Sequence, residues 1–181
     1  SPQDYSRIIV IFSIYALSIR IYMDFSGYTD LAVGASRLFG YKIMENFNRP
    51  FFKKNIVLFW RNWHISVYSW IRDYFFFPVF GSQASVAKLY MGLFLSMVVF
   101  HLWHEASFGF LIMGVYHGAG LVIFQLFQEL KKRLHFPQRK GYQRWLDPLS
   151  TILTFSFVSF GFLFFGNDIQ YALDLIKRIF F

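Results

Sequence analysis

The stretch LYMGLFLSMVVFHLWHEASFGFLIMGVYHGAGLVIFQLF, residues 89–127, decides the fold of this chain. Two strongly apolar runs, Leu89–Phe100 and Phe108–Phe127, flank the polar group His101–Glu105. Apolar runs of this kind are typical of helices that cross a membrane. We therefore predict two transmembrane helices that meet at residues 101–107, rather than one long tilted span.

The composition of the whole chain favours a membrane protein. Of its 181 residues, 56% are hydrophobic and only 15% are charged, whereas a soluble domain carries about a quarter charged residues. The formal net charge of +8 suits either nucleic acid or an anionic membrane surface. Because the apolar runs are long, we predict the lipid bilayer as the partner and no nucleic acid. The absence of cysteine excludes disulfides, thiolate metal sites and a cysteine nucleophile.

Further segments extend this pattern toward both ends of the chain. Ile8–Met23 and Leu149–Phe165 are apolar enough to form two more spans. Asn46–Pro50 has the composition of a loop. Tyr171–Phe181 has the pattern of an amphipathic helix. The sequence thus predicts four spans joined by shorter polar segments.

Two helical patterns are too short or too polar to span a bilayer. Residues 29–39 are expected to form a helix of their own, capped at Thr29 or Asp30 and ended by Gly40. Residues 56–71 carry apolar and tryptophan side chains at helical spacing, with basic residues around them. We expect this second helix either to lie at the membrane interface or to pack inside the protein, and the sequence favours neither.

Together these segments predict an all-α fold, a polytopic transmembrane helical bundle with interfacial or re-entrant helices. Residues 1–181 are expected to be a single transmembrane domain fragment, incomplete at both ends, because the chain stops within an apolar pattern. Basic residues gather in the stretches 24–80 and 129–148, and basic loops stay cytoplasmic. The join at residues 101–107 is then expected on the side away from the cytoplasm.

Ionisable residues inside apolar spans are costly and usually functional, which singles out His101, His104, Glu105 and His117. His104 suits a general base, because a neutral imidazole takes a proton from a hydroxyl that then attacks an acyl carbonyl. The cluster also suits a zinc or iron site, a proton or ion path, or hydrogen-bonded structural residues. The histidines alone leave these alternatives open. A histidine beside interfacial tryptophans is usually structural, so on the residues alone we expect His64 to anchor its helix.

Several short blocks resemble, in the same order, the motifs of the membrane-bound O-acyltransferase family. They are DFSGYTD at 24–30, ENFNRPF at 45–51, FWRNWHIS at 59–66, WIRDY at 70–74, Trp103-His104 followed by Tyr116-His117-Gly118, and GFLFF at 161–165. Each block is weak alone, and their shared order makes the set specific. The blocks are most similar to those of the bacterial alginate O-acetylation and teichoic-acid D-alanylation membrane proteins.

The resemblance implies a multi-helix fold with a deep funnel, a histidine at its base and O-acyltransferase activity. An acyl group, expected to be acetyl, would pass from a cytoplasmic thioester across the membrane toward an extracytoplasmic hydroxyl, for cell-surface or exopolysaccharide modification. By motif position the catalytic residues are His104 and His117. The residues implied at the substrate or at the donor entrance are Trp60, Trp63, His64, Trp103, Glu105, Asn46 and Asn48. No metal site is implied.

The resemblance also implies partners and a location. No cofactor is expected to be tightly bound; the donor substrate would be an acyl thioester, carried as acetyl-CoA or by an acyl carrier protein. A periplasmic acyltransferase or polysaccharide-modifying protein is the expected partner, and the location would be the bacterial cytoplasmic (inner) membrane, as a multi-pass protein.

Two positions depart from the family pattern. Glu105 stands where the family has glycine, so we expect it to narrow the pocket or to hydrogen-bond a histidine. Gly166 stands where the family has arginine, which removes a basic contact. The alternatives to this function are a histidine-rich membrane metal enzyme of the desaturase or hydroxylase type and a non-catalytic transporter module.

Overall fold

A computed structural model describes residues 2–83, 85–135, 140–166 and 168–181. In these residues the elements are helical, apart from one isolated β-bridge between Phe47 and Trp63. Four helical segments are long and apolar enough to cross a membrane, namely residues 7–38, 86–104, 108–133 and 146–164. These findings confirm the predicted all-α, multi-pass fold.

In chain order the elements are η1 (Pro2–Asp4), α1 (Arg7–Leu38), η2 (Pro50–Phe52), α2 (Ile56–Trp60), α3 (Ile65–Ile71), η3 (Arg72–Phe76), α4 (Phe77–Phe80), α5 (Val86–His104), α6 (Phe108–Arg133), α7 (Lys140–Gly161), η4 (Phe162–Phe164) and α8 (Ile169–Phe180).

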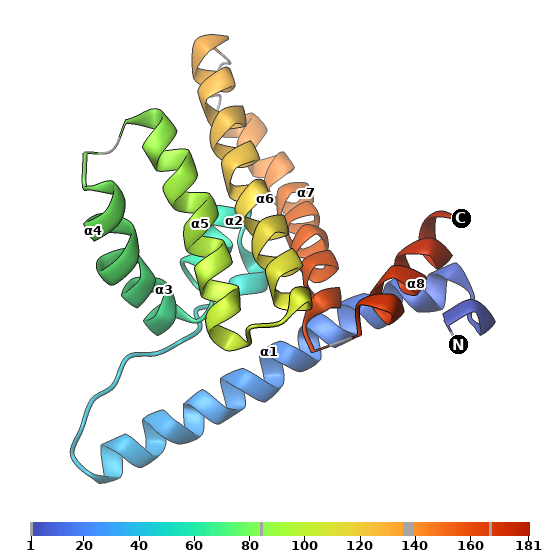
Figure 1. The fold of residues 1–181 in the computed structure, drawn as a ribbon, viewed down its shortest axis with the longest axis horizontal. Coiled ribbons are helices and arrows are strands. Elements are labelled where there is room, and N and C mark those ends of the chain that lie inside the picture. The colour runs from blue at the N-terminus through green and yellow to red at the C-terminus, as the bar shows by residue number, and fades with distance from the viewer. Residues whose placement is uncertain (1, 84, 136–139, 167) are drawn as a thin grey trace.

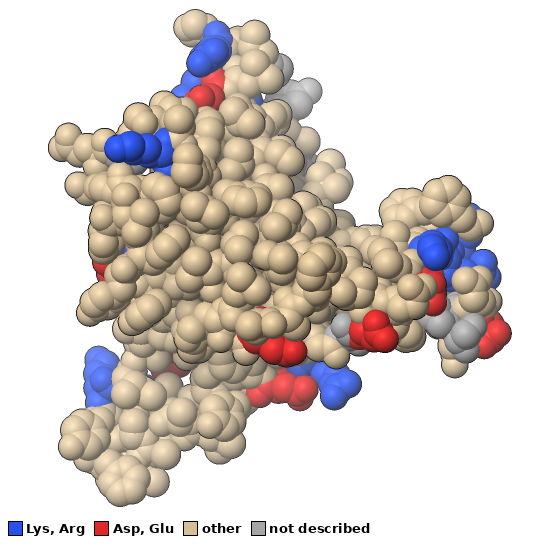
Figure 2. Space-filling view, in the orientation of Figure 1, with Lys and Arg blue, Asp and Glu red and all other residues tan. Residues whose placement is uncertain are grey.

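Three long helices, α5, α6 and α7, run side by side, and α1 crosses beneath their lower ends (Figure 1). α2 packs against α6 and α7, while α3 and α4 pack against α5. The two ends of the chain lie together, where Arg7 Nη2 donates to Phe181 O and Arg178 Nε donates to Tyr5 O, both at 2.8 Å. Figure 2 shows most of the charged residues toward the top, the lower edge and the right-hand end of this face. The middle of the face is left to other residues, as expected for helices that contact lipid or further protein.

The α5–α6 hairpin confirms the two predicted spans, and the chain turns between them at residues 105–107. Two glycines of α6 lie directly against the backbone of α5. A methyl group on Gly114 would meet Val98 Cα at 2.8 Å, and one on Gly118 would meet Phe94 O at 2.9 Å. Small residues let membrane helices approach this closely, so these two glycines set the spacing of the hairpin.

The predicted division of α1 into a span and a second helix is wrong, because α1 is one continuous helix of 32 residues. Neither Thr29 nor Asp30 begins a helix; Thr29 Oγ1 instead donates to Ser26 O at 2.9 Å within α1. A hydroxyl that bonds back to the preceding turn leaves the helix intact. The predicted end is confirmed: Phe39 caps α1 and Gly40 follows with φ +81°, which glycine adopts without strain.

The predicted helix over residues 56–71 is interrupted between α2 and α3. The interruption ends at His64, whose backbone is left-handed with φ 46° and ψ 56°, a conformation that is uncommon outside glycine. Phe59, Trp60 and Trp63 are only 0%, 1% and 4% exposed. This first part of the segment therefore packs inside the protein. Of the two alternatives that the sequence left open, internal packing holds for these residues.

The predicted loop that starts at Asn46 is confirmed, and it braces this interruption. Asn46 Oδ1 accepts hydrogen bonds from the backbone N–H of Ser66 at 3.1 Å and from its hydroxyl at 2.6 Å. The backbone of the loop adds two more bonds, from Ile65 N to Asn46 O at 3.0 Å and from Asn48 N to Asn62 O at 3.1 Å. One asparagine side chain thus holds the first turn of α3, directly after the left-handed residue.

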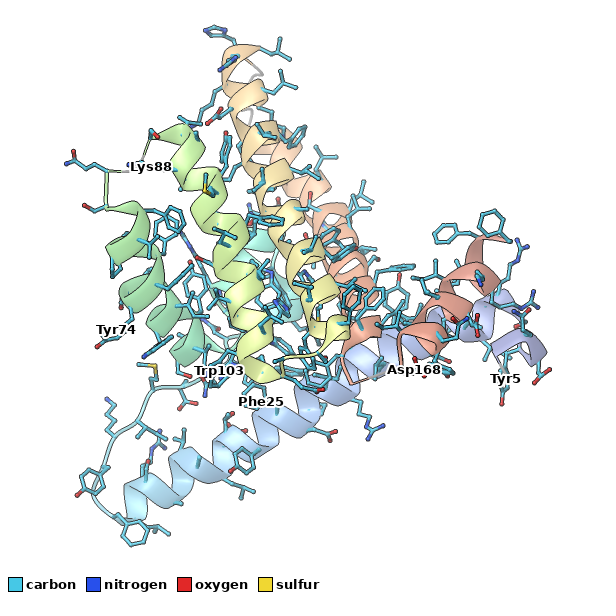
Figure 3. All side chains as sticks on the ribbon, viewed as in Figure 1. Tyr5, Phe25, Tyr74, Lys88, Trp103 and Asp168 are labelled. Atoms are coloured by element: carbon cyan, nitrogen blue, oxygen red, sulfur yellow. The ribbon has the colours of Figure 1, made fainter. Side chains whose placement is uncertain are left out.

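The two basic stretches, expected at one end of the bundle, lie only partly together. Lys54 of the first stretch pairs with Asp147 of the second, at 3.3 Å, but the residues around the C-terminal end of α1 lie elsewhere. The C-terminal end of α6 and the start of α5, near the labelled Lys88, lie together at the top of Figure 3. The C-terminal end of α1 and the loop after it lie toward the opposite end of α5, where Trp103 is labelled. Because α1 continues unbroken to Leu38, it carries the following residues away from the basic end of α6.

We predict that Gly118→Ala destabilises the protein. The added methyl meets the carbonyl oxygen of Phe94 on α5, so the two helices must separate, at a cost of about 1–3 kcal/mol. Gly34→Ala is the matched control, since a methyl group there meets nothing within 4 Å. Thermal unfolding in detergent, followed by tryptophan fluorescence, should show a lower Tm for Gly118→Ala only. Equal Tm values for both variants would contradict the close packing of α5 and α6.

We also predict that Asn46→Ala loosens the segment that carries His64. Two partly buried donors of Ser66 lose their acceptor, and a lost hydrogen bond costs about 0.5–1.5 kcal/mol. Asn48→Ala serves as the control, because its hydrogen bond to Asn62 comes from the backbone N–H and survives the change. Faster amide hydrogen exchange at residues 64–67 is expected for Asn46→Ala alone. If both variants exchange at the wild-type rate, the brace is not formed by the Asn46 side chain.

Candidate functional site

A cavity of about 790 Å³ lies between the lower ends of α5 and α6 and the middle of α1. Phe25 of α1 and Trp103 of α5, labelled in Figure 3, lie at this end of the bundle and both line the cavity. Most of the wall is apolar or aromatic, and its polar members are histidines and one pair of charged residues. The lining residues are Leu17, Arg20, Ile21, Asp24, Phe25, Trp60, Trp63, His64, Phe100, His101, Trp103, His104, Phe110, Met113, Phe162, Phe165 and Gly166.

His64 and His104 face this cavity together, with ring centroids 5.6 Å apart. His104 is the last residue of α5 and is exposed, while His64 immediately precedes α3. Phe100 lies against both rings, at 6.0 Å from His64 and 5.5 Å from His104. Phe25 packs perpendicular to the His64 ring at 4.6 Å. Aromatic packing therefore orients two imidazoles toward one space of substrate size.

His64 is the more buried of the two rings, at 6% exposed. Burial, and to a smaller extent the proximity of His104, lowers the pKa of His64 to about 4. The ring is therefore neutral near pH 7, because burial disfavours its charged form. Within the described part of the chain, its Nδ1 atom has no hydrogen-bond partner. A neutral imidazole with an unused ring nitrogen is suited to bond a substrate group.

A second pair of histidines lies behind the first. His101 and His117, 1% and 0% exposed, stack with ring centroids 5.4 Å apart. His101 Nδ1 lies 2.7 Å from Met97 O; since a carbonyl only accepts, this nitrogen carries the proton. Gly161 packs against His117 Nε2, where a methyl group would overlap the ring. Among the described residues, no group of three or more His, Cys, Asp or Glu is arranged to hold a metal ion.

The structure brings together only some of the predicted site residues. Five of them line the 790 Å³ cavity: Trp60, Trp63, His64, Trp103 and His104. His117 stands behind the wall and is fully buried. Asn46 bonds to the first turn of α3 and Asn48 to Asn62 just before it, and neither asparagine lines the cavity.

Glu105 is exposed and lies outside the cavity wall. Its backbone closes the end of α5, with its N–H 3.5 Å from His101 O and its carbonyl accepting from Ser107 N at 2.9 Å. Neither the narrowing of the pocket nor a hydrogen bond to a histidine, both expected from this departure, is supported by these contacts.

Sequence reasoning did not place the charged pair of α1 in the site. Arg20 Nε lies 3.5 Å from Asp24 Oδ2, and both side chains line the cavity. They are 77% and 72% exposed, so the ion pair itself contributes little to stability. The available signal was Arg20, a charge within the apolar run of residues 8–23, since charges at such positions usually face a water-filled space.

A smaller cavity of about 230 Å³ lies on the other side of Trp60. Trp60 and Phe100 line both cavities, whereas Arg61, Arg72 and Gln125 line only the smaller one. Arg72 is held by Asp73, with bonds of 2.7 and 2.8 Å from its guanidinium to the two carboxylate oxygens. This bond raises the pKa of Arg72 and lowers the pKa of Asp73.

The amino-acid sequence is similar to those of several bacterial acyltransferases. A probable alginate O-acetylase of Pseudomonas aeruginosa is 36% identical over 91% of this chain and 30% of its own length. A teichoic acid D-alanyltransferase of Bacillus subtilis is 36% identical over 84% of this chain and 40% of its own length. A peptidoglycan O-acetyltransferase of Helicobacter pylori is 32% identical over 88% of this chain and 29% of its own length.

The chain spans 29–40% of the length of these three relatives. The model of the membrane-bound O-acyltransferase family matches residues 2–166, which include every helix from α1 to α7 as well as both cavities. The chain belongs to the membrane-bound O-acyltransferase family.

Proposed function

We propose that this chain forms the reaction cavity of a membrane O-acyltransferase, with His104 as the general base. The observation that carries the proposal is the placement of two imidazoles, His64 and His104, 5.6 Å apart in one cavity of about 790 Å³. That volume lies within the range of about 300–1,000 Å³ typical of small-molecule sites. The relatives' names supply the reaction class, since two describe O-acetyl transfer and one D-alanyl transfer.

In the proposed step, His104 takes the proton from an acceptor hydroxyl as the hydroxyl oxygen attacks the thioester carbonyl. The new C–O bond forms, the C–S bond breaks, and the proton passes from His104 to the departing thiolate. The thiolate is a good leaving group, so the main tasks of the protein are orientation and exclusion of water. The aromatic wall formed by Phe25, Phe100 and Phe110 suits both tasks.

We assign different roles to the other histidines. His64 is neutral and close to His104, so it is placed to hold the hydroxyl or the carbonyl oxygen by a hydrogen bond. His117 does not reach the cavity and therefore acts as a positioning residue. Its ring packs against Trp60 at 4.9 Å and against His101 at 5.4 Å, which fixes the wall behind the reacting groups.

The remaining expectations belong to the same proposal. The donor is an acyl thioester, carried as acetyl-CoA or on an acyl carrier protein, that arrives from the cytoplasm; the acceptor is an extracytoplasmic hydroxyl on a cell-surface polymer or exopolysaccharide. A periplasmic acyltransferase or polysaccharide-modifying protein is the proposed partner, and the bacterial inner membrane the proposed location. The relatives named for alginate, peptidoglycan and teichoic acid support a polymeric acceptor.

We predict that His104→Gln in the full-length protein lowers the rate of acyl transfer by about 10²–10⁴-fold, the usual contribution of a general base. Glutamine keeps a polar side chain and accepts no proton. Transfer of label from a radioactive acetyl thioester, measured in membranes, reports the rate. His135→Gln is the control, because His135 is exposed in the turn after α6. Equal rates for wild type and His104→Gln would make His104 a structural residue.

A second variant, His64→Asn, tests the partner ring without disturbing the backbone. Asparagine tolerates the left-handed conformation of this position better than most residues. We expect about a tenfold or greater loss of the transfer rate and an unchanged Tm. The two readouts together separate chemistry from folding: a lower Tm with an unchanged rate would show that His64 serves only the structure.

A further inference from the structure

Trp60 lies between the two cavities described above. Its side chain is part of the wall of both the 790 Å³ cavity and the 230 Å³ cavity. The side chain is 1% exposed and packs against Phe100, with ring centroids 5.2 Å apart, and against His117 at 4.9 Å. Since both cavities touch the same ring, this side chain forms a partition between them.

The smaller cavity offers an apolar space beyond that partition. Its volume is about 230 Å³, and a flexible hydrocarbon chain gains about 0.8 kcal/mol for each methylene that it buries. Arg61, Arg72 and Gln125 give the cavity a polar side, but most of the lining is aliphatic or aromatic. The aliphatic members are Val57, Ile71, Leu89, Leu93, Met97 and Leu121.

The indole is held in the partition by packing. Among the residues that the structure describes, Trp60 Nε1 is buried and has no hydrogen-bond partner. A buried donor without a partner costs about 1–3 kcal/mol, so this nitrogen does not stabilise the wall. Replacing the ring by a smaller apolar side chain therefore removes volume without breaking a hydrogen bond.

We propose that Trp60 determines the length of the acyl group that the protein accepts. The closed partition confines the acyl group to the larger cavity and favours short groups such as acetyl. Without the indole the two cavities join, and a longer apolar acyl chain extends into the smaller one. The bonds made and broken are unchanged, since an ester forms and the thioester C–S bond breaks. This inference rests on the proposed acyl transfer at His104.

Trp60 tests this role more cleanly than Phe100, the other residue shared by the two cavities. The Phe100 ring lies 5.5 Å from His104 and 6.0 Å from His64, so its removal would disturb the proposed reacting groups. Trp60 instead packs against the buried pair, at 5.4 Å from His101 and 4.9 Å from His117. A change at Trp60 is thus expected to act on the space for the acyl chain.

The test measures transfer of acetyl and octanoyl groups from their coenzyme A thioesters by the full-length protein in membranes. Trp60→Ala should raise the ratio of octanoyl to acetyl transfer at least tenfold, because single methylenes in apolar pockets discriminate by about 10–200-fold. Trp60→Leu, a smaller loss of volume, should raise the ratio in the same direction and guards against a folding defect in Trp60→Ala.

Trp63→Ala is the matched control. Trp63 is equally aromatic and 4% exposed, but it lines only the larger cavity, so its loss should leave the ratio near the wild-type value. An unchanged ratio in both Trp60 variants, with normal acetyl transfer by the wild type, would overturn the inference about Trp60 alone. Absence of acetyl and octanoyl transfer in the wild type would overturn the proposed function and this inference with it.

Discussion

The close approach of α5 and α6 across Gly114 and Gly118 is the constraint on which the rest of the site depends. Both glycines face the α5 backbone, where a methyl group would meet atoms at 2.8–2.9 Å. This contact brings His117 of α6 within 5.4 Å of His101 of α5. Once these rings stack, Trp60 packs across them and closes the wall behind His104, at the end of the same helix. The spacing of the α5–α6 hairpin thus positions both His104 and the rings of His101, His117 and Trp60 that lie behind it.

The second constraint is the short braced segment that delivers His64. The helix over residues 56–71 breaks, and His64 adopts a left-handed backbone that non-glycine residues adopt only when the surroundings impose it. Asn46 supplies this restraint through its two bonds to Ser66. The motif residues divide accordingly: Asn46 holds the backbone, and His64 faces the cavity. Residues from the family's motifs therefore do not all occupy the site itself.

The sequence predicted the spans well because each long apolar run has few ways to satisfy its backbone in lipid. Residues 89–127 gave the hairpin, and the histidines at its join led to the cavity. The prediction failed where tertiary structure overrode a local signal. Thr29 bonds to Ser26 within α1, so the expected helix start does not form. The periodic stretch 56–71 contains a break before α3 that its spacing does not reveal. The meeting of His64 with His104, 40 residues later in the chain, and the entry of Arg20 into the wall depend on tertiary packing that no local pattern encodes. Charge grouped only part of the basic residues: Lys54 pairs with Asp147, but the unbroken α1 carries its C-terminal end away from the basic end of α6.

The central claim is that acyl transfer takes place between His64 and His104. The most direct measurement is a cryo-EM structure of the full-length protein with a non-hydrolysable acetyl-coenzyme A analogue, in which a methylene replaces the thioester sulfur. The account predicts that the analogue carbonyl lies in the 790 Å³ cavity, facing His64 and His104. A carbonyl held elsewhere, for example beside Arg61 and Arg72 in the smaller cavity, with no ligand density at His104, would contradict it.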